Sequence, residues 1–240
     1  MINNKKIIAV ITARAGSSLT GKNYRRFCDM PLIYWSVLAA QLSEYVDSVI
    51  VSTNCKEVEK VVKGGNGLSD KTIILNRPDA LSTATSKNES ALIHAYWWSS
   101  LKKDLTADII INLQPTSPIR NRHLIDNCLE SMVNGNHDSL LTVNKSTPFM
   151  WKSKDSKYSP MYDVLNRPMR QDITDSEFLL YDNGCLYMMN SDILLDRMCR
   201  IGYNPYLFET TQYQSMQIDT EEDFIIMESV CKSALNNIPI

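Results

Sequence analysis

Residues 7–23 decide the fold of this chain, and they read IIAVITARAGSSLTGKN. The opening part, Ile7–Ala13, is apolar and has the length of a buried strand. Arg14 and Gly16 end this apolar run and begin a loop. The stretch therefore predicts a buried strand that leads directly into a polar loop.

Alternating strand and helix patterns extend outward from this stretch through about the first 145 residues. Further strands are expected at Asp47–Thr53, Thr72–Leu75, Ala107–Leu113 and Ser139–Val143. Helices are expected at Pro31–Leu42, Lys56–Lys63, Ser86–Leu101 and Leu124–Val133. Such alternation predicts a parallel, doubly wound α/β sheet, with its most apolar strand, Ala107–Leu113, at the centre.

The alternation stops at residues 144–177, a polar segment with three prolines, four lysines and several aromatic residues. Because it is too long for an ordinary loop, we expect a single domain over residues 1–240 with a protruding arm at about 144–177. Beyond it, Asp182-Asn183-Gly184 is typical of a turn between the two apolar runs of Phe178–Met189. Thr220–Leu235 predicts an amphipathic helix that Asp219 or Thr220 can cap.

The composition excludes several classes of protein. The 240 residues are 44% hydrophobic and carry a net charge of −2, which indicates a globular protein without a global basic field for nucleic acid. No apolar run approaches the roughly 20 residues that span a bilayer, and the polar N-terminus lacks a signal-peptide pattern. The six cysteines are scattered and form no CxxC pair, which predicts reduced thiols and a cytoplasmic location.

Polar and cationic residues follow successive predicted strands, where ligands bind in an open α/β sheet. The first strand is followed by Arg14, Gly16, Ser17, Lys22 and Asn23, the third by Arg77, and the fourth by Gln114, Thr116, Ser117 and Arg120. Donors combined with cations suit a polyphosphate, although Gln114 fits a helix cap equally well. The glycine spacing matches neither the dinucleotide fingerprint nor the P-loop, so those two classes are unsupported.

A series of motifs along the chain resembles the N-acylneuraminate cytidylyltransferases, or CMP-sialic acid synthetases. Residues 13–17 (ARAGS) followed by Lys22-Asn23 are similar to the signature loop of that family. Residues 114–120 (QPTSPIR), 170–172 (RQD) and 218–224 (IDTEEDF) continue the pattern in order. The resemblance therefore covers nearly the whole chain.

The resemblance implies a Rossmann-like nucleotidyltransferase sheet with an arm that makes a homodimer. It implies transfer of CMP from CTP to the anomeric hydroxyl of a sialic, legionaminic or pseudaminic type of nonulosonic acid, with Mg²⁺ required and pyrophosphate released. Arg14, Lys22 and Gln114 would be catalytic, and Asp219 would hold the metal. The nucleotide would be bound by Arg14, Gly16, Ser17, Lys22, Asn23 and Arg77, and the sugar acid by Gln114 and Arg170.

Two positions depart from the family pattern. Ser18 stands where lysine is usual, and Gln217 stands where the terminal motif usually has aspartate. Gln217 is a weaker partner for Mg²⁺ than a carboxylate, and Arg25, Arg26 and Lys87 are candidates to replace the missing lysine. Two alternatives therefore stay open: a catalytically degenerate homologue that binds nucleotide or sugar acid without turnover, and a cytidylyltransferase for the eight-carbon sugar Kdo.

Overall fold

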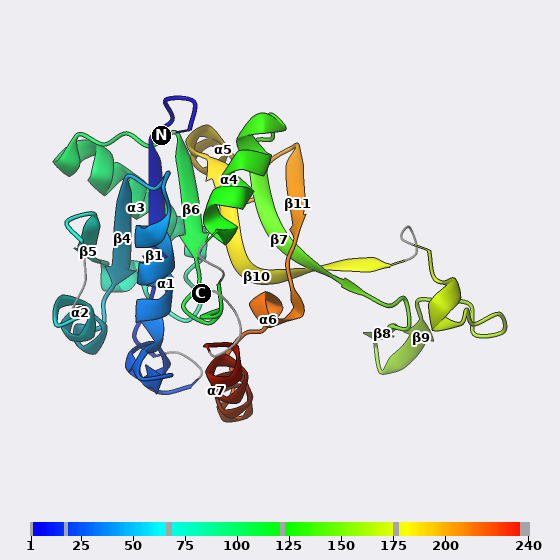
Figure 1. The fold of residues 1–240 in the computed structure, drawn as a ribbon. Helices are drawn as coiled ribbons and strands as arrows, with labels where there is room; N and C mark the ends of the chain where they lie inside the picture. Colours follow the sequence, from blue (N-terminus) through cyan, green and yellow to red (C-terminus); the bar gives the residue numbers. More distant parts are fainter. Residues whose placement is uncertain (1, 17–18, 66–68, 121–122, 175–177, 236–240) are drawn as a thin grey trace.

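The computed structural model describes residues 2–16, 19–65, 69–120, 123–174 and 178–235, and its centre is a seven-stranded sheet (Figure 1). The strand order is β11-β7-β10-β6-β1-β4-β5. The strands are β1 (Ile7–Thr12), β4 (Ser48–Thr53), β5 (Thr72–Asn76), β6 (Ile109–Leu113), β7 (Ser139–Ser146), β10 (Leu179–Asn190) and β11 (Pro205–Glu209). β6 is the central strand, as its apolar sequence predicts, and the Rossmann-like α/β class is confirmed.

The strands predicted within the first 145 residues are parallel, and a later strand, β10, runs in the opposite direction. β6, β1, β4 and β5 are parallel, whereas β10 runs antiparallel to both β6 and β7. The chain between β7 and β10 forms a long excursion and returns beside the strand that it left. A strand that returns without a crossover helix pairs antiparallel, so β10 is reversed while β7 and β11 keep the direction of β6.

The predicted turn at Asp182-Asn183-Gly184 is wrong, because β10 passes through these residues as one strand. The pairing with β7 shifts register between Asp182 and Tyr187. Gly184 has a φ of 67°, and its N–H donates to Asp182 Oδ1 over 3.0 Å. The turn-forming residues therefore build an irregularity inside a strand, since glycine adopts positive φ without steric cost.

Helices cover both faces of the sheet because successive strand residues point to opposite sides. Ile7, Ala9 and Ile11 pack on one side, together with apolar residues of α1 (Leu32–Leu42), α2 (Lys56–Lys63) and α4 (Leu124–Asn134). Ile8 and Val10 pack on the other side, with α3 (Asn88–Lys103) and α5 (Ser191–Arg197). The two faces together form the core that holds the strand ends in place.

The C-terminal helix, α7 (Glu221–Leu235), packs against the beginning of the chain. Its Phe224 ring lies 5.6 Å from the ring of Phe27, in a short hairpin of β2 (Arg26–Phe27) and β3 (Met30–Pro31). The remaining short elements are η1 (Lys22–Tyr24), η2 (Asp79–Leu81) and α6 (Gln212–Ser215). This packing brings the segment before α7 beside η1.

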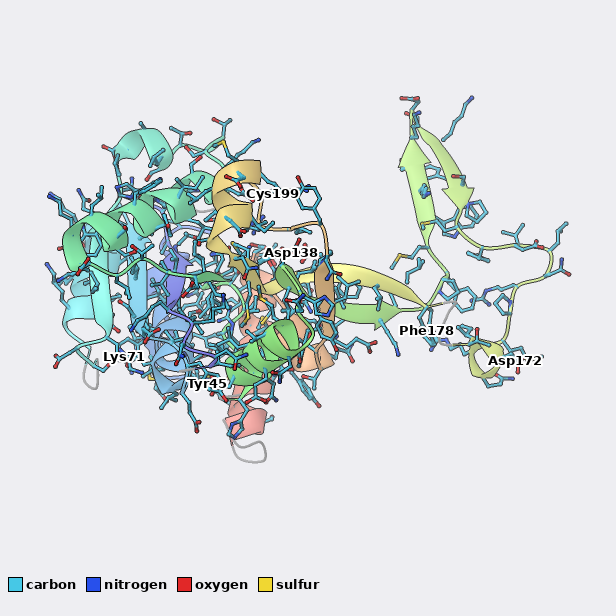
Figure 2. All side chains as sticks on the ribbon, turned by 90° about the horizontal axis from the view of Figure 1, so that it is seen from above. Tyr45, Lys71, Asp138, Asp172, Phe178 and Cys199 are labelled. Carbon is cyan, nitrogen blue, oxygen red and sulfur yellow. The ribbon has the colours of Figure 1, made fainter. Side chains whose placement is uncertain are left out.

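The segment between β7 and β10 projects from the sheet and carries β8 (Trp151–Lys154), β9 (Lys157–Pro160) and η3 (Arg170–Asp172) (Figures 1 and 2). Large apolar side chains are exposed on it: Met150, Trp151, Tyr158, Met161, Val164, Leu165 and Met169. Apolar surface gathered on a projecting segment is typical of an interaction surface. Within the described part of the chain, every helix is too short or too polar to cross a membrane.

Candidate active site

A cavity of about 270 Å³ lies over the carboxyl ends of β1, β5 and β6. It is lined by Thr12, Arg14, Lys22, Asn23, Arg77, Leu81, Ser86, Lys87, Asn88, Gln114, Pro115, Thr116 and Arg200. Five residues proposed from the sequence for catalysis or nucleotide binding therefore meet here, because parallel strands end at a common edge. They are Arg14, Lys22, Asn23, Arg77 and Gln114, and Thr116 and Lys87 join them.

The charge of the cavity is one-sided. Its lining includes Arg14, Lys22, Arg77, Lys87 and Arg200, and none of the described lining residues is an aspartate or a glutamate. A concave site with cations of one sign attracts anions and raises their local concentration. The arrangement is therefore suited to a ligand with several negative charges.

Arg77 is a largely buried cation in the wall of the cavity. Burial, and then the positive charge of Arg14, lower the pKa of the Arg77 guanidinium. Its Nε donates to Ser82 Oγ over 3.0 Å, while its buried Nη2 has no hydrogen-bond partner among the described residues. Because a buried donor without a partner is costly, a ligand oxygen would relieve both the charge and the missing bond.

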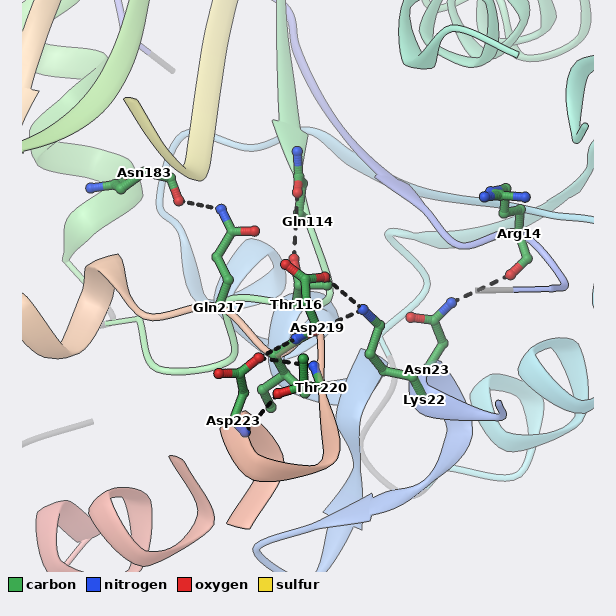
Figure 3. Close-up of polar contacts among 11 residues, drawn as sticks. Arg14, Lys22, Asn23, Gln114, Thr116, Asn183, Gln217, Asp219, Thr220 and Asp223 are labelled. Carbon is green, nitrogen blue, oxygen red and sulfur yellow. Dashed lines mark hydrogen bonds and ion pairs between the residues drawn. The ribbon is translucent and has the colours of Figure 1, made fainter. Parts of the chain in front are cut away.

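Lys22 is held in place by the segment that leads into α7 (Figure 3). The left-handed Gly21, at φ 71°, begins η1 and precedes this buried lysine. Lys22 Nζ donates to Ile218 O over 2.7 Å and lies 3.0 Å from Asp219 Oδ1. The side chain of Lys22 is 5% exposed and that of Asp219 is 61% exposed. The ion pair therefore extends from the buried wall of the cavity to the protein surface.

Asn23 and the loop after β6 complete this side of the cavity. Asn23 Nδ2 lies 3.5 Å from Arg14 O, which ties η1 to the loop after β1. Thr116 Oγ1 donates to Gln114 Oε1 over 3.4 Å, and Ile218 N donates to Thr116 O over 2.8 Å. The Gln114 side chain is thus placed on a wall shared by β6 and the segment before α7.

Arg120, which the sequence groups with the rim donors, points into the protein instead. It is 3% exposed, and burial lowers the pKa of its guanidinium. Nη1 donates to Ser36 Oγ over 2.7 Å, and Nη2 donates to Gln114 O over 2.6 Å and Cys185 O over 2.7 Å. Arg120 therefore joins α1, the Gln114 loop and β10 rather than facing a ligand.

The start of α7 is capped by Thr220 and Asp223. Asp223 Oδ2 accepts hydrogen bonds from Asp219 N over 3.0 Å and Thr220 N over 2.8 Å, and Asp223 N donates to Thr220 Oγ1 over 3.1 Å. Thr220 and Asp223 thus satisfy the start of the helix. The carboxylate of Asp219 lies toward Lys22 and the cavity wall (Figure 3).

The side chains near Lys22 offer few ligands for an ion such as Mg²⁺. In the described ranges, no three His, Cys, Asp or Glu side chains gather into a metal cluster. Gln217 Nε2 donates to Asn183 O, and Asp223 is engaged in capping. Asp219 remains as the carboxylate beside the cavity, and Mg²⁺ commonly uses one or two carboxylates together with substrate phosphates and water.

The candidate replacement cations and Gly16 lie at different places relative to the cavity. Lys87 lines the cavity, whereas Arg25 pairs with Glu221 at 2.6 Å and Arg26 lies 3.8 Å from Asp29, so Lys87 is the candidate replacement cation that reaches the site. Gly16 lines an adjoining pocket of about 160 Å³.

Ser17 and Ser18 lie outside the described residues. Arg170 lies on the projecting segment, and the structure does not bring it to the cavity of its own chain (Figure 1).

Sequence reasoning missed Arg200 and Asn88, which also line the cavity. Asn88 stands at the beginning of α3, where its Nδ2 donates to Asn112 Oδ1 over 2.7 Å. Arg200 follows α5 and belongs to no recognisable motif. Only the position of β10 beside β6 brings the residues that follow β10 to this site.

The strand order and the cationic cavity define a Rossmann-like α/β protein with a site at its strand ends that is suited to an anionic ligand. A profile of the cytidylyltransferase family matches residues 8–237, and the chain belongs to that family.

The fold resembles a solved CMP:2-keto-3-deoxy-manno-octonic acid synthetase complexed with CTP, with a TM-score of 0.67 and 18% identity, over 95% of this chain and 99% of that one. A 4-diphosphocytidyl-2C-methyl-D-erythritol synthase from Anaerococcus prevotii has a TM-score of 0.66 and 10% identity, over 95% of this chain and 99% of that one.

Curated relatives have similar sequences over most of the chain. An N-acylneuraminate cytidylyltransferase A from Danio rerio is 26% identical over 94% of this chain and 50% of its own length. A CMP-N,N'-diacetyllegionaminic acid synthase from Legionella pneumophila is 28% identical over 94% of this chain and 96% of its own length. The chain thus spans about half the length of the Danio rerio relative and nearly all of the bacterial one.

Proposed function

We propose that this protein transfers CMP from CTP to the anomeric hydroxyl of a nonulosonic acid and releases pyrophosphate. The observation that carries the proposal is the cavity at the strand ends, where Arg14, Lys22, Arg77 and Gln114 meet without a carboxylate among the described lining residues. Family membership supports the choice of a cytidine nucleotide. The names of the relatives support a sialic or legionaminic type of acceptor.

In this proposal, catalysis depends on placement and charge neutralisation. The acceptor hydroxyl oxygen attacks the α-phosphorus of CTP, the hydroxyl proton passes to solvent, the bond from that phosphorus to the bridging oxygen breaks, and pyrophosphate leaves. Arg14 and Lys22 neutralise the phosphates, Asn23 and Arg77 hold the nucleotide, and Gln114 orients the sugar acid. Gly16, in the adjoining pocket, allows the loop after β1 to approach the phosphates.

We also propose Mg²⁺ as the cofactor, held by Asp219 together with phosphate oxygens, where it would neutralise charge on the leaving group. Asp219→Asn is expected to raise the Mg²⁺ concentration for half-maximal turnover by roughly tenfold, because one carboxylate ligand is lost. Magnesium titrations of the pyrophosphate release rate measure this. Asp192→Asn, an exposed substitution on α5, is the control. An unchanged magnesium dependence would show that Asp219 pairs with Lys22 but does not hold the metal.

The projecting segment supports a homodimer, with Arg170 of each copy presented to the sugar acid of the other. We expect the protein to sediment at twice the chain mass of 27.3 kDa at micromolar concentration. Leu165→Glu, at a side chain that is 90% exposed, should shift it to 27.3 kDa by placing charge in the interface. A 27.3 kDa species for the unaltered protein would contradict this prediction.

The reaction is tested by pyrophosphate release from CTP and Mg²⁺ with sialic, legionaminic and pseudaminic acids and Kdo, with UTP and ATP as controls. Release that requires both CTP and one acid supports the proposal, and release only with Kdo supports the alternative activity. Binding of CTP without release would favour the degenerate homologue, for which Gln217 provides the structural reason. The unpaired state of all six cysteines is in keeping with the cytoplasmic location that we propose.

A further inference from the structure

Arg200 is a cavity-lining cation that the proposed reaction has not used. Its Nε lies 2.8 Å from Glu89 Oε1, and its Cζ lies 4.2 Å from the centre of the Tyr187 ring. An ion pair on one edge and an aromatic ring against one face fix the plane of the guanidinium. Arg200 is therefore a rigid side chain in the wall of the cavity.

One nitrogen of this guanidinium has no partner. Arg200 Nη1 is buried, and no hydrogen bond to it occurs among the described residues. Buried donors in folded proteins are nearly always satisfied, and leaving one unsatisfied costs about 1–3 kcal/mol. Arg200 lines the cavity, and a ligand oxygen that reached Nη1 there would satisfy it.

The strand order separates Arg200 from the nucleotide side of the cavity. Its aromatic partner, Tyr187, is on β10, and its neighbour in the lining, Asn88, is bonded to Asn112 on β6. Arg14 follows β1 and Arg77 follows β5, on the other side of β6 in the sheet. If CTP lies over Arg14 and Arg77, the group that reaches Arg200 belongs to the acceptor.

The charge around Arg200 restricts that group further. Glu89 is 15% exposed, and its carboxylate already neutralises the guanidinium. A neutralised guanidinium whose Nη1 has no partner among the described residues favours a neutral oxygen acceptor over a second carboxylate. An acyl carbonyl or a hydroxyl oxygen of the sugar acid has this character.

We propose that Arg200 determines acceptor specificity by donating a hydrogen bond from Nη1 to a neutral oxygen on a substituent of the sugar acid. This inference rests on the proposed function. Glu89 and Tyr187 act as positioning residues that hold the guanidinium for this contact.

The test compares the unaltered protein with R200K, which keeps a cation beside Glu89 and loses the planar fork. KM for CTP and for each acid is measured with N-acetylneuraminic acid and with its analogue that carries a hydroxyl in place of the acetamido group. R200K is expected to raise KM for the acceptor about tenfold, the loss of one hydrogen bond, with KM for CTP unchanged within about twofold. A rise with the acetamido acid alone identifies the acyl carbonyl as the partner, and a rise with both acids identifies a shared hydroxyl.

The matched control is R197K, at an exposed arginine that stacks at 3.7 Å on Tyr203 outside the cavity lining. R200Q provides a second variant if R200K fails to fold, and melting temperatures identify that case. If R200K changes KM for CTP and KM for the acceptor equally, or changes neither, the proposed role of Arg200 is overturned. The proposed function is not affected by that result.

If the unaltered protein releases no pyrophosphate, calorimetric titration with the same two acids in the presence of CMP replaces turnover. Binding that R200K weakens about tenfold then supports Arg200 although the reaction fails. Absence of both binding and turnover overturns the two proposals together.

Discussion

Replacing Lys22 with methionine is expected to lower kcat/KM for pyrophosphate release by a factor of roughly 100 to 1,000. Lys22 is the buried cation that joins the cavity to the segment before α7, through Ile218 O at 2.7 Å and Asp219 at 3.0 Å. Because Lys22 is buried, its fixed positive charge stabilises developing negative charge on a phosphate better than it would in solution. Methionine keeps most of the side-chain volume and removes the charge.

Steady-state kinetics with CTP and the best acceptor measure this effect, and a melting curve separates it from loss of folding. The matched control is Lys63→Met, because Lys63 is exposed on α2 and pairs with Glu59 away from the cavity. Lys63→Met should leave kcat/KM within about twofold, as surface pairs contribute little. Near-normal turnover of a folded K22M protein would remove Lys22 from the catalytic residues.

Replacing Arg120 with methionine is expected to lower the free energy of unfolding by about 3 kcal/mol. The guanidinium satisfies Ser36 Oγ and two buried backbone carbonyls, those of Gln114 and Cys185. Ser36 Oγ can still donate to Gln114 O, at 3.3 Å, but Cys185 O would lose the Arg120 hydrogen bond. Release of a buried charge offsets part of this loss, because no carboxylate is bonded to Arg120 among the described contacts.

Urea unfolding followed by circular dichroism measures the change, provided that the transition is two-state. Arg26→Met is the control, since the Arg26 side chain is 75% exposed and its loss should change stability by less than about 0.5 kcal/mol. Equal midpoints for the Arg120 and Arg26 variants would show that the three contacts of Arg120 contribute nothing net. In that case Arg120 would have to be reconsidered as a ligand contact.

Local patterns were sufficient to predict most of the secondary structure. α2 begins and ends at the predicted residues, Lys56 and Lys63, and β6 occupies the predicted centre of the sheet. Short apolar runs and helical periodicity indicate which residues are buried. These patterns were sufficient because the strands of the sheet and the helices that cover it each bury apolar residues. Asp182-Asn183-Gly184 was misread because the same residues serve turns and strand irregularities, and the choice depends on what the flanking strands pair with.

The side of the candidate site that we propose for the nucleotide was predictable for a related reason. Arg77 and Gln114 directly follow strands and Arg14 lies two positions after β1. Because parallel strands end at one edge, their convergence required no knowledge of side-chain packing. Arg200 was not predictable, because it follows a helix and reaches the cavity only through the antiparallel return of β10. The inward direction of Arg120 was equally hidden, since a charged residue in a loop normally faces water.

The sequence by itself thus determined the fold class, the order of the main elements and a cationic rim at the strand ends. The tertiary structure decided the direction of β10, the burial of Arg120, the choice of Lys87 over Arg25 and Arg26, and the contact between Lys22 and Asp219. Lys22 and Asp219 are 197 positions apart in the chain. The periodicity of apolar residues indicates which positions are buried. The direction of a charged side chain depends instead on whether groups from distant parts of the chain replace the hydrogen bonds that water would make to it.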